Sequence, residues 1–195
     1  YVDLVFRAGG IPVELIPYLG LLKAALGQLD TEHYTYGEFS NELNLHTGGI
    51  NCSVGSYDSV KNPKDYQAVF EVKSKALYGE LPVAFSMIQE MLLTSKLQDK
   101  KRLREIVSET RSRLQMAFQT AGHSMAALRA MSYFLSSAAF SDMTGGVDFY
   151  RFIEELDGQF EDRWEIAAEN LAKLGRILFC PENLLVSYTG AVSYT

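Results

Sequence analysis

Residues 66–77 have the sequence YQAVFEVKSKAL, and this stretch decides the fold class. Its side chains fall into two alternating sets, Ala68, Phe70 and Val72 against Val69, Glu71 and Lys73. A period of two predicts a strand with one buried face. Residues 50–57 also have strand composition, and the polar turn KNPKD at residues 61–65 separates the two segments. The sequence therefore predicts a β-hairpin.

Two further strands are predicted near the ends of the sequence. Residues 1–7, YVDLVFR, place Val2, Leu4 and Phe6 on one face, and residues 183–188 return to strand composition. Together with the hairpin, they predict a sheet of about four strands near residues 2–8, 49–58, 65–76 and 184–189. Because the sequence opens on Tyr1 without a methionine, we expect it to be an excised fragment.

Helical patterns fill the rest of the sequence. In residues 13–26, leucines recur at steps of 4, 3 and 4, and Thr35 with Glu38 has the spacing of a capping box. The predicted helices cover residues 13–26, 35–45, 81–93, 99–120, 124–138, 147–156 and 160–174. Strands and helices occur in blocks and do not alternate. The sequence therefore predicts a single α+β domain over residues 1–190, with helices on one face of a mixed or antiparallel sheet, and a tail at 191–195.

Composition narrows the function classes. The sequence has 195 residues, of which 47% are hydrophobic, and its net charge of −6 argues against a nucleic-acid partner. Its one dense basic run, KKRLR at residues 100–104, is interpreted as a solvated helix face. No apolar stretch reaches the ~18 residues of a membrane span, so no membrane partner is expected. Two cysteines and no visible signal peptide predict a reduced compartment, the cytoplasm or an organellar matrix.

Motifs for catalysis are weak. There is no phosphate-binding loop, nucleophile elbow or CxxC pair, and the three histidines are His33, His46 and His123. The segment LDTEH at residues 29–33 imitates the inverted zinc motif HxxEH, but a leucine occupies its first position. His123 follows a glycine and is interpreted as part of a helix start and not as a general base. The residues alone indicate an α+β domain without a visible catalytic constellation.

One metal hypothesis stays open at this point. Glu38, Glu42 and His46 are spaced i, i+4 and i+8 on a predicted helix, so they share one face. Positions i and i+8 lie about 12 Å apart along a straight helix, and one helix rarely closes a metal site alone. A small metalloenzyme built on these three residues is therefore a minor alternative, which metal analysis of the purified protein addresses.

Several segments together resemble one family. They are YVDLVF at 1–6, PVELIPYL at 12–19, LDT at 29–31, YTYGEF at 34–39, TGGI at 47–50, GHS at 122–124 and RAMS at 129–132. In this order and spacing they resemble the pitrilysin/insulinase superfamily of zinc peptidases, and specifically the third, non-catalytic domain of its presequence-protease branch. The resemblance runs from residue 1 to about residue 190, although no single motif is diagnostic.

The resemblance implies a clamshell of four related α+β domains. The first domain carries HxxEH and a distal Glu that bind zinc, and the second half closes a chamber around a peptide. In this sequence the HxxEH positions fall on Leu21, Ala24 and Ala25, and the distal Glu falls near Glu105 or Glu109. A lone carboxylate without imidazoles cannot hold catalytic zinc. We therefore expect no catalytic, cofactor-binding or metal-binding residue in this sequence, with zinc held by the parent enzyme's amino-terminal domain.

The leading hypothesis is a catalytically silent domain of a zinc metalloendopeptidase that degrades unfolded peptides. The domain would form part of the peptide-enclosing chamber wall, with the remaining domains of the parent and unfolded peptides as partners. The alternative is a non-enzymatic scaffold or assembly subunit of the same fold. An HxxEH motif upstream in the same open reading frame separates the two. The inner face of the helix that holds Leu21, Leu22, Ala24 and Ala25 is expected to be packed.

Overall fold

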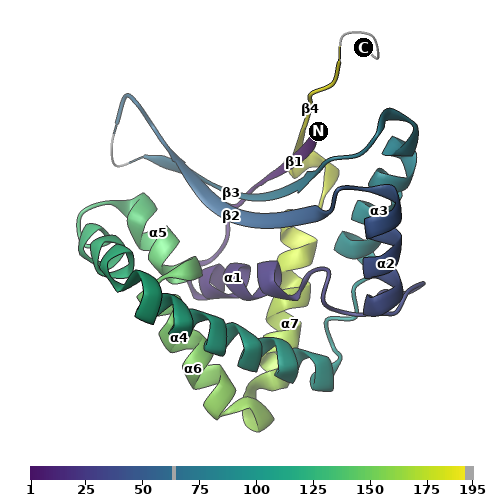
Figure 1. Ribbon diagram of the computed structural model, residues 1–195. Helices are drawn as coiled ribbons and strands as arrows, with labels where there is room; N and C mark the ends of the chain where they lie inside the picture. The colour runs from purple at the N-terminus through teal and green to yellow at the C-terminus, as the bar shows by residue number, and fades with distance from the viewer. Residues whose placement is uncertain (63–64, 192–195) are drawn as a thin grey trace.

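A four-stranded sheet forms the upper layer of the molecule (Figure 1). The computed structural model describes residues 1–62 and 65–191. The strands are β1 (Val2–Arg7), β2 (Ile50–Asp58), β3 (Tyr66–Ser74) and β4 (Leu184–Tyr188). They lie in the order β2-β3-β1-β4, and each neighbouring pair is antiparallel. Both the predicted hairpin and the predicted four-stranded sheet are confirmed, although β3 ends at Ser74, before the expected residue 77.

The helices gather on one face of this sheet, as predicted (Figure 1). They are α1 (Ile16–Ala25), α2 (Tyr36–His46), α3 (Leu81–Thr94), α4 (Lys100–Met131), α5 (Ser136–Gly145), α6 (Val147–Gly158) and α7 (Phe160–Leu178). Three short 3-10 turns, η1 (Val13–Leu15), η2 (Tyr78–Glu80) and η3 (Pro181–Asn183), connect the elements. The α+β class with an antiparallel sheet is therefore confirmed.

The predicted capping box begins α2. The hydroxyl of Thr35 accepts a hydrogen bond from the backbone N–H of Glu38 at 3.3 Å. In return, the Glu38 carboxylate accepts one from the backbone N–H of Thr35 at 2.9 Å. The pair satisfies two backbone donors that a helix start leaves free, so α2 begins where the sequence indicates.

The helix boundaries around residue 121 differ from the prediction. Separate helices were expected over 99–120 and 124–138, but α4 runs continuously from Lys100 to Met131, with a kink at Ala121 (φ −133°, ψ 33°). The chain then turns before α5 begins at Ser136. Arg129, near the end of α4, lies 2.7 Å from carboxylates of both Asp142 and Asp148. These ion pairs tie α4 to the two following helices, so the chain has to reverse soon after Arg129.

The buried core extends from Val2 to Leu178, with α1 at its centre. α1 carries Pro17 in its first turn and ends just before Gly27, whose φ of +80° favours glycine. Above it, the rings of Phe6 and Phe70 meet Phe179 edge-on, at centroid distances of 5.1 and 5.7 Å. The core therefore fixes α1 beneath the sheet. Residues 192–195 of the predicted tail lie outside the described residues.

Candidate functional site

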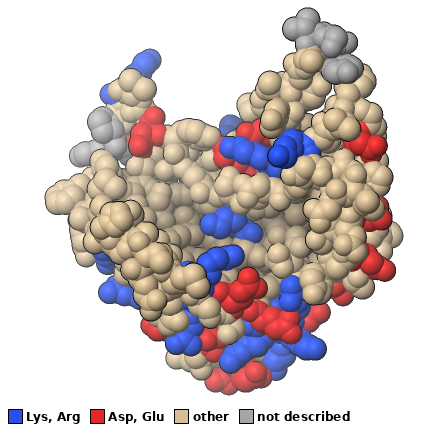
Figure 2. Space-filling view, viewed as in Figure 1, with Lys and Arg blue, Asp and Glu red and all other residues tan. Residues whose placement is uncertain are grey.

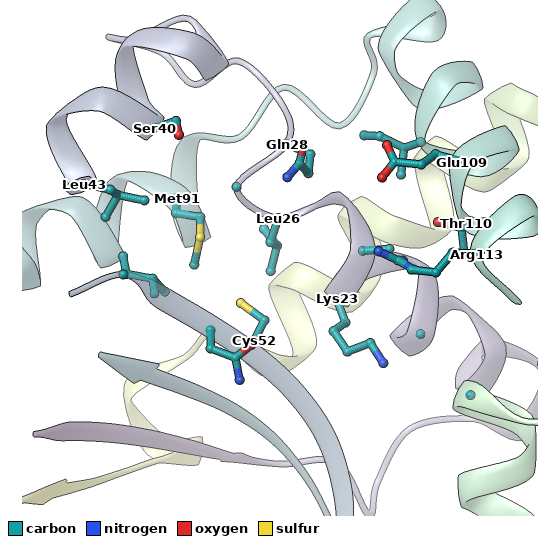
Figure 3. Close-up of a pocket in the computed structure, with 18 of the residues that line it drawn as sticks. Lys23, Leu26, Gln28, Ser40, Leu43, Cys52, Met91, Glu109, Thr110 and Arg113 are labelled. Carbon is teal, nitrogen blue, oxygen red and sulfur yellow. The ribbon is translucent and has the colours of Figure 1, made fainter. Parts of the chain in front are cut away.

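A cavity of about 540 Å³ lies between α1, α4 and strand β2 (Figure 3). α1 contributes Lys23 and Ala24, β2 contributes Cys52, and α4 contributes Glu109 and Arg113. Figure 2 shows Lys or Arg side chains inside the hollow beneath the sheet. The cavity therefore combines a helix from the core, the rim of the sheet and the long helix α4 in one concave surface.

The positions that the resemblance assigns to HxxEH are divided by the structure. Leu21 and Ala25 are fully buried in the core, at 0% exposure, whereas Ala24 lines the cavity. The expected packed face is thus found at Leu21, Leu22 and Ala25 but not at Ala24. The residues of α1 that do line the cavity are Gly20, Lys23 and Ala24, which have the same i, i+3, i+4 spacing one residue earlier. Neither register contains an imidazole or a carboxylate.

Gly20 also leaves no space for a ligand at its position. A Cβ added there would lie 2.5 Å from the carbonyl oxygen of Thr144 and 2.6 Å from the ring of Phe149. Such separations are well inside van der Waals contact, so a larger side chain requires α5 and α6 to move. A zinc-binding histidine at Gly20 is therefore incompatible with this packing.

The two candidate distal glutamates have different surroundings. Glu105 forms an ion pair with Arg102 at 2.7 Å, one helical turn away. Glu109 lines the cavity with Arg113, so it shares that space with Ala24 and Lys23. Of the two positions, only Glu109 faces the cavity within the described part of the chain. No imidazole accompanies it there.

The cavity is electrostatically unusual because it holds two cations that lack partners within the described residues. Burial lowers the pKa of Lys23, and repulsion from the Arg113 guanidinium lowers it further. Within residues 1–62 and 65–191, neither side chain forms an ion pair or a hydrogen bond. The cavity is therefore suited to an anionic group and repels a metal cation.

Cys52 on β2 faces the same cavity. Burial raises the pKa of its thiol to about 12, although the nearby charge of Lys23 acts in the opposite direction. Cys52 and Cys180 are both free thiols. Because the thiolate is the reactive form, Cys52 is poorly suited to nucleophilic chemistry.

The residues of the minor metal hypothesis are used separately. The Glu38 carboxylate caps α2, as described above, and His46 Nδ1 lies 2.8 Å from Glu80, with its Nε2 3.5 Å from Glu42. His33 Nδ1 lies 3.0 Å from Glu90. In the described residues, no group of three or more His, Cys, Asp or Glu side chains could hold a metal ion. His123 lies inside α4, two residues after the kink, and not at the helix start that the sequence indicates.

Sequence reasoning missed Lys23 and Arg113 as a pair. Lys23 did carry a signal, because it is the sole charged residue in the α1 sequence IPYLGLLKAA. A lone charge on an otherwise apolar helix marks a side that faces something other than the core. Arg113 carried no such signal among the many charges of α4. Their proximity depends on how α1 and α4 pack.

Solved structures place this fold among peptidases of the pitrilysin type. Pitrilysin matches with a TM-score of 0.58 and 17% identity, over 95% of this chain and 18% of that chain. A structure described as a putative M16-like peptidase from Alicyclobacillus acidocaldarius matches with a TM-score of 0.52 and 12% identity, over 95% of this chain and 39% of the other. The fold is therefore that of an M16 peptidase domain.

The family follows from sequence. The model of the peptidase-associated family that accompanies subfamily C of the M16 peptidases matches residues 1–156, and the chain belongs to this family. Protein HypA of Clostridium perfringens is 32% identical over 190 residues, which are 97% of this chain and 19% of that protein. The mitochondrial presequence protease of Yarrowia lipolytica is 30% identical over 168 residues, 86% of this chain and 17% of that protein. The predicted resemblance to the presequence-protease branch is confirmed.

The comparisons also set the scale of the chain. Presequence protease 1 of Arabidopsis thaliana, a chloroplastic and mitochondrial protein, is 24% identical over 97% of this chain but only 17% of its own length. The chain thus spans about a fifth of the curated relatives that it matches. The family description makes it a domain associated with a peptidase. Among the described residues, no helix is long and apolar enough to cross a membrane.

Proposed function

We propose that the chain is a catalytically silent domain of a zinc metalloendopeptidase that degrades unfolded peptides. Residues 1–190 act as a single domain and form part of the wall of the peptide-enclosing chamber. The remaining domains of the parent peptidase are its partners, and the zinc belongs to the parent's amino-terminal domain. The support is membership of the peptidase-associated family and the share of the relatives that the chain spans.

One observation carries the silent assignment: Lys23 lies on the cavity side of α1, at the position that the i, i+3, i+4 spacing gives to the catalytic carboxylate. An ammonium group cannot accept a proton from metal-bound water, and together with Arg113 it repels Zn²⁺. The neighbouring ligand positions carry glycine and alanine. Zinc does not fit the residues present, whichever register is taken.

The wall role is supported by the free edge of the sheet. Within the described residues β2 is paired on one side only, with β3, and its first residues line the cavity. An unpaired strand edge offers backbone donors and acceptors to an extended peptide. The edge and the cavity next to it give this domain a surface for binding an unfolded chain without cleaving it.

The location follows from the same reasoning. Relatives of this chain include presequence proteases named as mitochondrial or chloroplastic. Its two described cysteines are free thiols, as in a reducing compartment. We place the parent in an organellar matrix or the cytoplasm. Fractionation of cells that express the tagged parent tests this location, and recovery outside the cell contradicts it.

Two measurements test the silent role: zinc content after dialysis, and cleavage of a quenched unfolded peptide. The purified chain alone is expected to retain no stoichiometric zinc and to cleave nothing. A mixture with the parent's amino-terminal half is expected to cleave the peptide in a chelator-sensitive manner. Chelator-sensitive cleavage by the chain alone contradicts the silent role. A parent open reading frame without HxxEH favours the scaffold or assembly subunit instead.

A further inference from the structure

We propose that Lys23 and Arg113 form a subsite that binds a carboxylate of an extended peptide lying along the free edge of β2. This inference rests on the proposed function, because it gives the chamber wall a chemical preference. The ligand is a peptide carboxylate, from either an acidic side chain or a free carboxyl terminus. No metal or covalent step is involved.

The first argument is the charge of the cavity. Lys23 and Arg113 line the same space from different helices, and Figure 3 shows both side chains extending toward it. Neither has an ion-pair partner among the described residues. Two like charges in a partly enclosed space destabilise each other, and each keeps an incomplete hydrogen-bond shell. An anion placed between them removes both costs.

The second argument is geometric. Ile50, Asn51 and Cys52 at the start of β2 border the cavity, and in the described residues this edge of the strand has no neighbour. A peptide that pairs with this edge sends alternate side chains toward the helical layer. The cavity of about 540 Å³ falls within the range of about 300–1,000 Å³ typical of ligand pockets. One acidic side chain or terminal carboxylate can therefore enter it.

Glu109 is the one carboxylate on the cavity lining within the described part of the chain. It lies one turn from Arg113 on α4, yet the two do not form an ion pair. Glu109 therefore leaves the guanidinium available and repels an incoming anion. Replacing it gives a variant whose effect is opposite in sign to that of removing either cation.

The test uses the 195-residue chain and three labelled peptides, each about nine residues long to span the strand edge, of alternating Ser and Val. The first has a central Glu and blocked ends, the second a central Gln and blocked ends, and the third a central Gln and a free carboxyl terminus. In fluorescence anisotropy, at least one carboxylate peptide is expected to bind about tenfold more tightly than the neutral peptide, as one charged hydrogen bond provides. A gain with the first or the third identifies the source of the carboxylate.

Variants assign the effect to the cavity. Lys23→Gln and Arg113→Gln are each expected to reduce the roughly tenfold preference to about threefold or less, and Glu109→Gln to increase it. Lys101→Gln, an exposed lysine of α4 outside the cavity, is the matched control and is expected to leave the preference unchanged. If Lys23→Gln fails to fold, Arg113→Gln and the wild-type peptide series still decide.

The outcomes separate the two proposals. Equal affinity for all three peptides overturns the carboxylate subsite but leaves the wall role intact. Loss of the preference in Lys101→Gln as well as in the cavity variants also overturns the subsite, because the effect is then general electrostatics. Absence of binding by every peptide overturns the subsite and counts against the wall role. The cleavage assay with the amino-terminal half then tests the wall role separately.

Discussion

Gly20 of α1 packs directly against the carbonyl oxygen of Thr144, which a Cβ at Gly20 would approach to 2.5 Å. The same Cβ would meet the Phe149 ring at 2.6 Å. This contact between α1, α5 and α6 allows α1 to lie close to its neighbours. It also excludes any metal-binding side chain from the position.

The contact predicts that Gly20→Ala destabilises the fold. Overpacking costs about 1–3 kcal/mol, more than the ~1 kcal/mol that alanine gains over glycine in a helix. Gly175→Ala is the matched control, because a Cβ there meets its nearest neighbour, Phe179, at an ordinary 3.8 Å inside α7. Urea unfolding should show a loss for the first variant and no loss for the second. A stabilised Gly20→Ala protein is the outcome that contradicts the packing.

Asp142 is a buried carboxylate with two partners. It is 1% exposed, accepts a hydrogen bond from the backbone N–H of Val147 at 2.8 Å and pairs with Arg129 at 2.7 Å. Asp142→Ala leaves the partly buried Val147 N–H without its acceptor, which costs about 1–3 kcal/mol. Asp148→Ala, the control, removes the more exposed partner of Arg129 and should change stability little. Thermal unfolding of both variants checks this, and equal melting temperatures would count against the role of Asp142.

Glu90 predicts a pH dependence of stability. Burial raises the pKa of its carboxyl, but hydrogen bonds from Thr31, His33 and Thr94 outweigh burial and lower it to about 2. Because the folded pKa lies below the unfolded value, the stabilisation is complete above about pH 4.5 and is lost as the pH falls toward about 2. Glu90 should therefore contribute to acid unfolding.

Urea midpoints at about pH 5, 4 and 3, a range that spans the unfolded pKa of a glutamate, test this contribution. In wild type the midpoint is expected to fall over this range, and Glu90→Gln should flatten part of that fall. Glu169→Gln, which removes an exposed carboxylate of α7, controls for the loss of one titrating group. If the Glu90 and Glu169 variants have the same pH slope as wild type, the hydrogen bonds to Glu90 do not act as described.

Local patterns determine much of this fold. The alternation of Phe70 with Glu71 predicted β3, and the spacing of Thr35 and Glu38 predicted the start of α2, because both signals act over a few residues. The continuity of α4 could not be predicted in this way. It depends on ion pairs between Arg129 and later helices, which the helical period does not encode.

The candidate site was less predictable than the fold. The sequence showed that α1 lacks the residues of a zinc motif, and Glu109 was one of two positions suggested for a distal carboxylate. It could not show that Lys23 and Arg113 line one cavity, because they lie on helices whose relative position is set by tertiary packing. Nor could the apolar period of α1 show which side faces solvent, since Leu21, Leu22 and Ala25 are all fully buried.

The last prediction concerns the two thiols. Burial raises the pKa of Cys52 to about 12, so its thiolate fraction at pH 8 is only about one in ten thousand. Cys180, which lies in the turn before η3, donates a weak hydrogen bond to the carbonyl oxygen of Ile177 and is more exposed to solvent. A thiol reagent should therefore label Cys180 first and Cys52 much more slowly in the folded chain.

Labelling with and without urea tests this, with Cys180→Ser as the control that isolates Cys52. Lys23→Gln should slow Cys52 further, because the nearby cation favours the thiolate. If instead Cys52 in the folded Cys180→Ser chain reacts as fast as in urea, the cavity is more open than the structure indicates. Protection of Cys52 by an acidic peptide, but not by its neutral counterpart, would link the thiol and the two cations to one binding space.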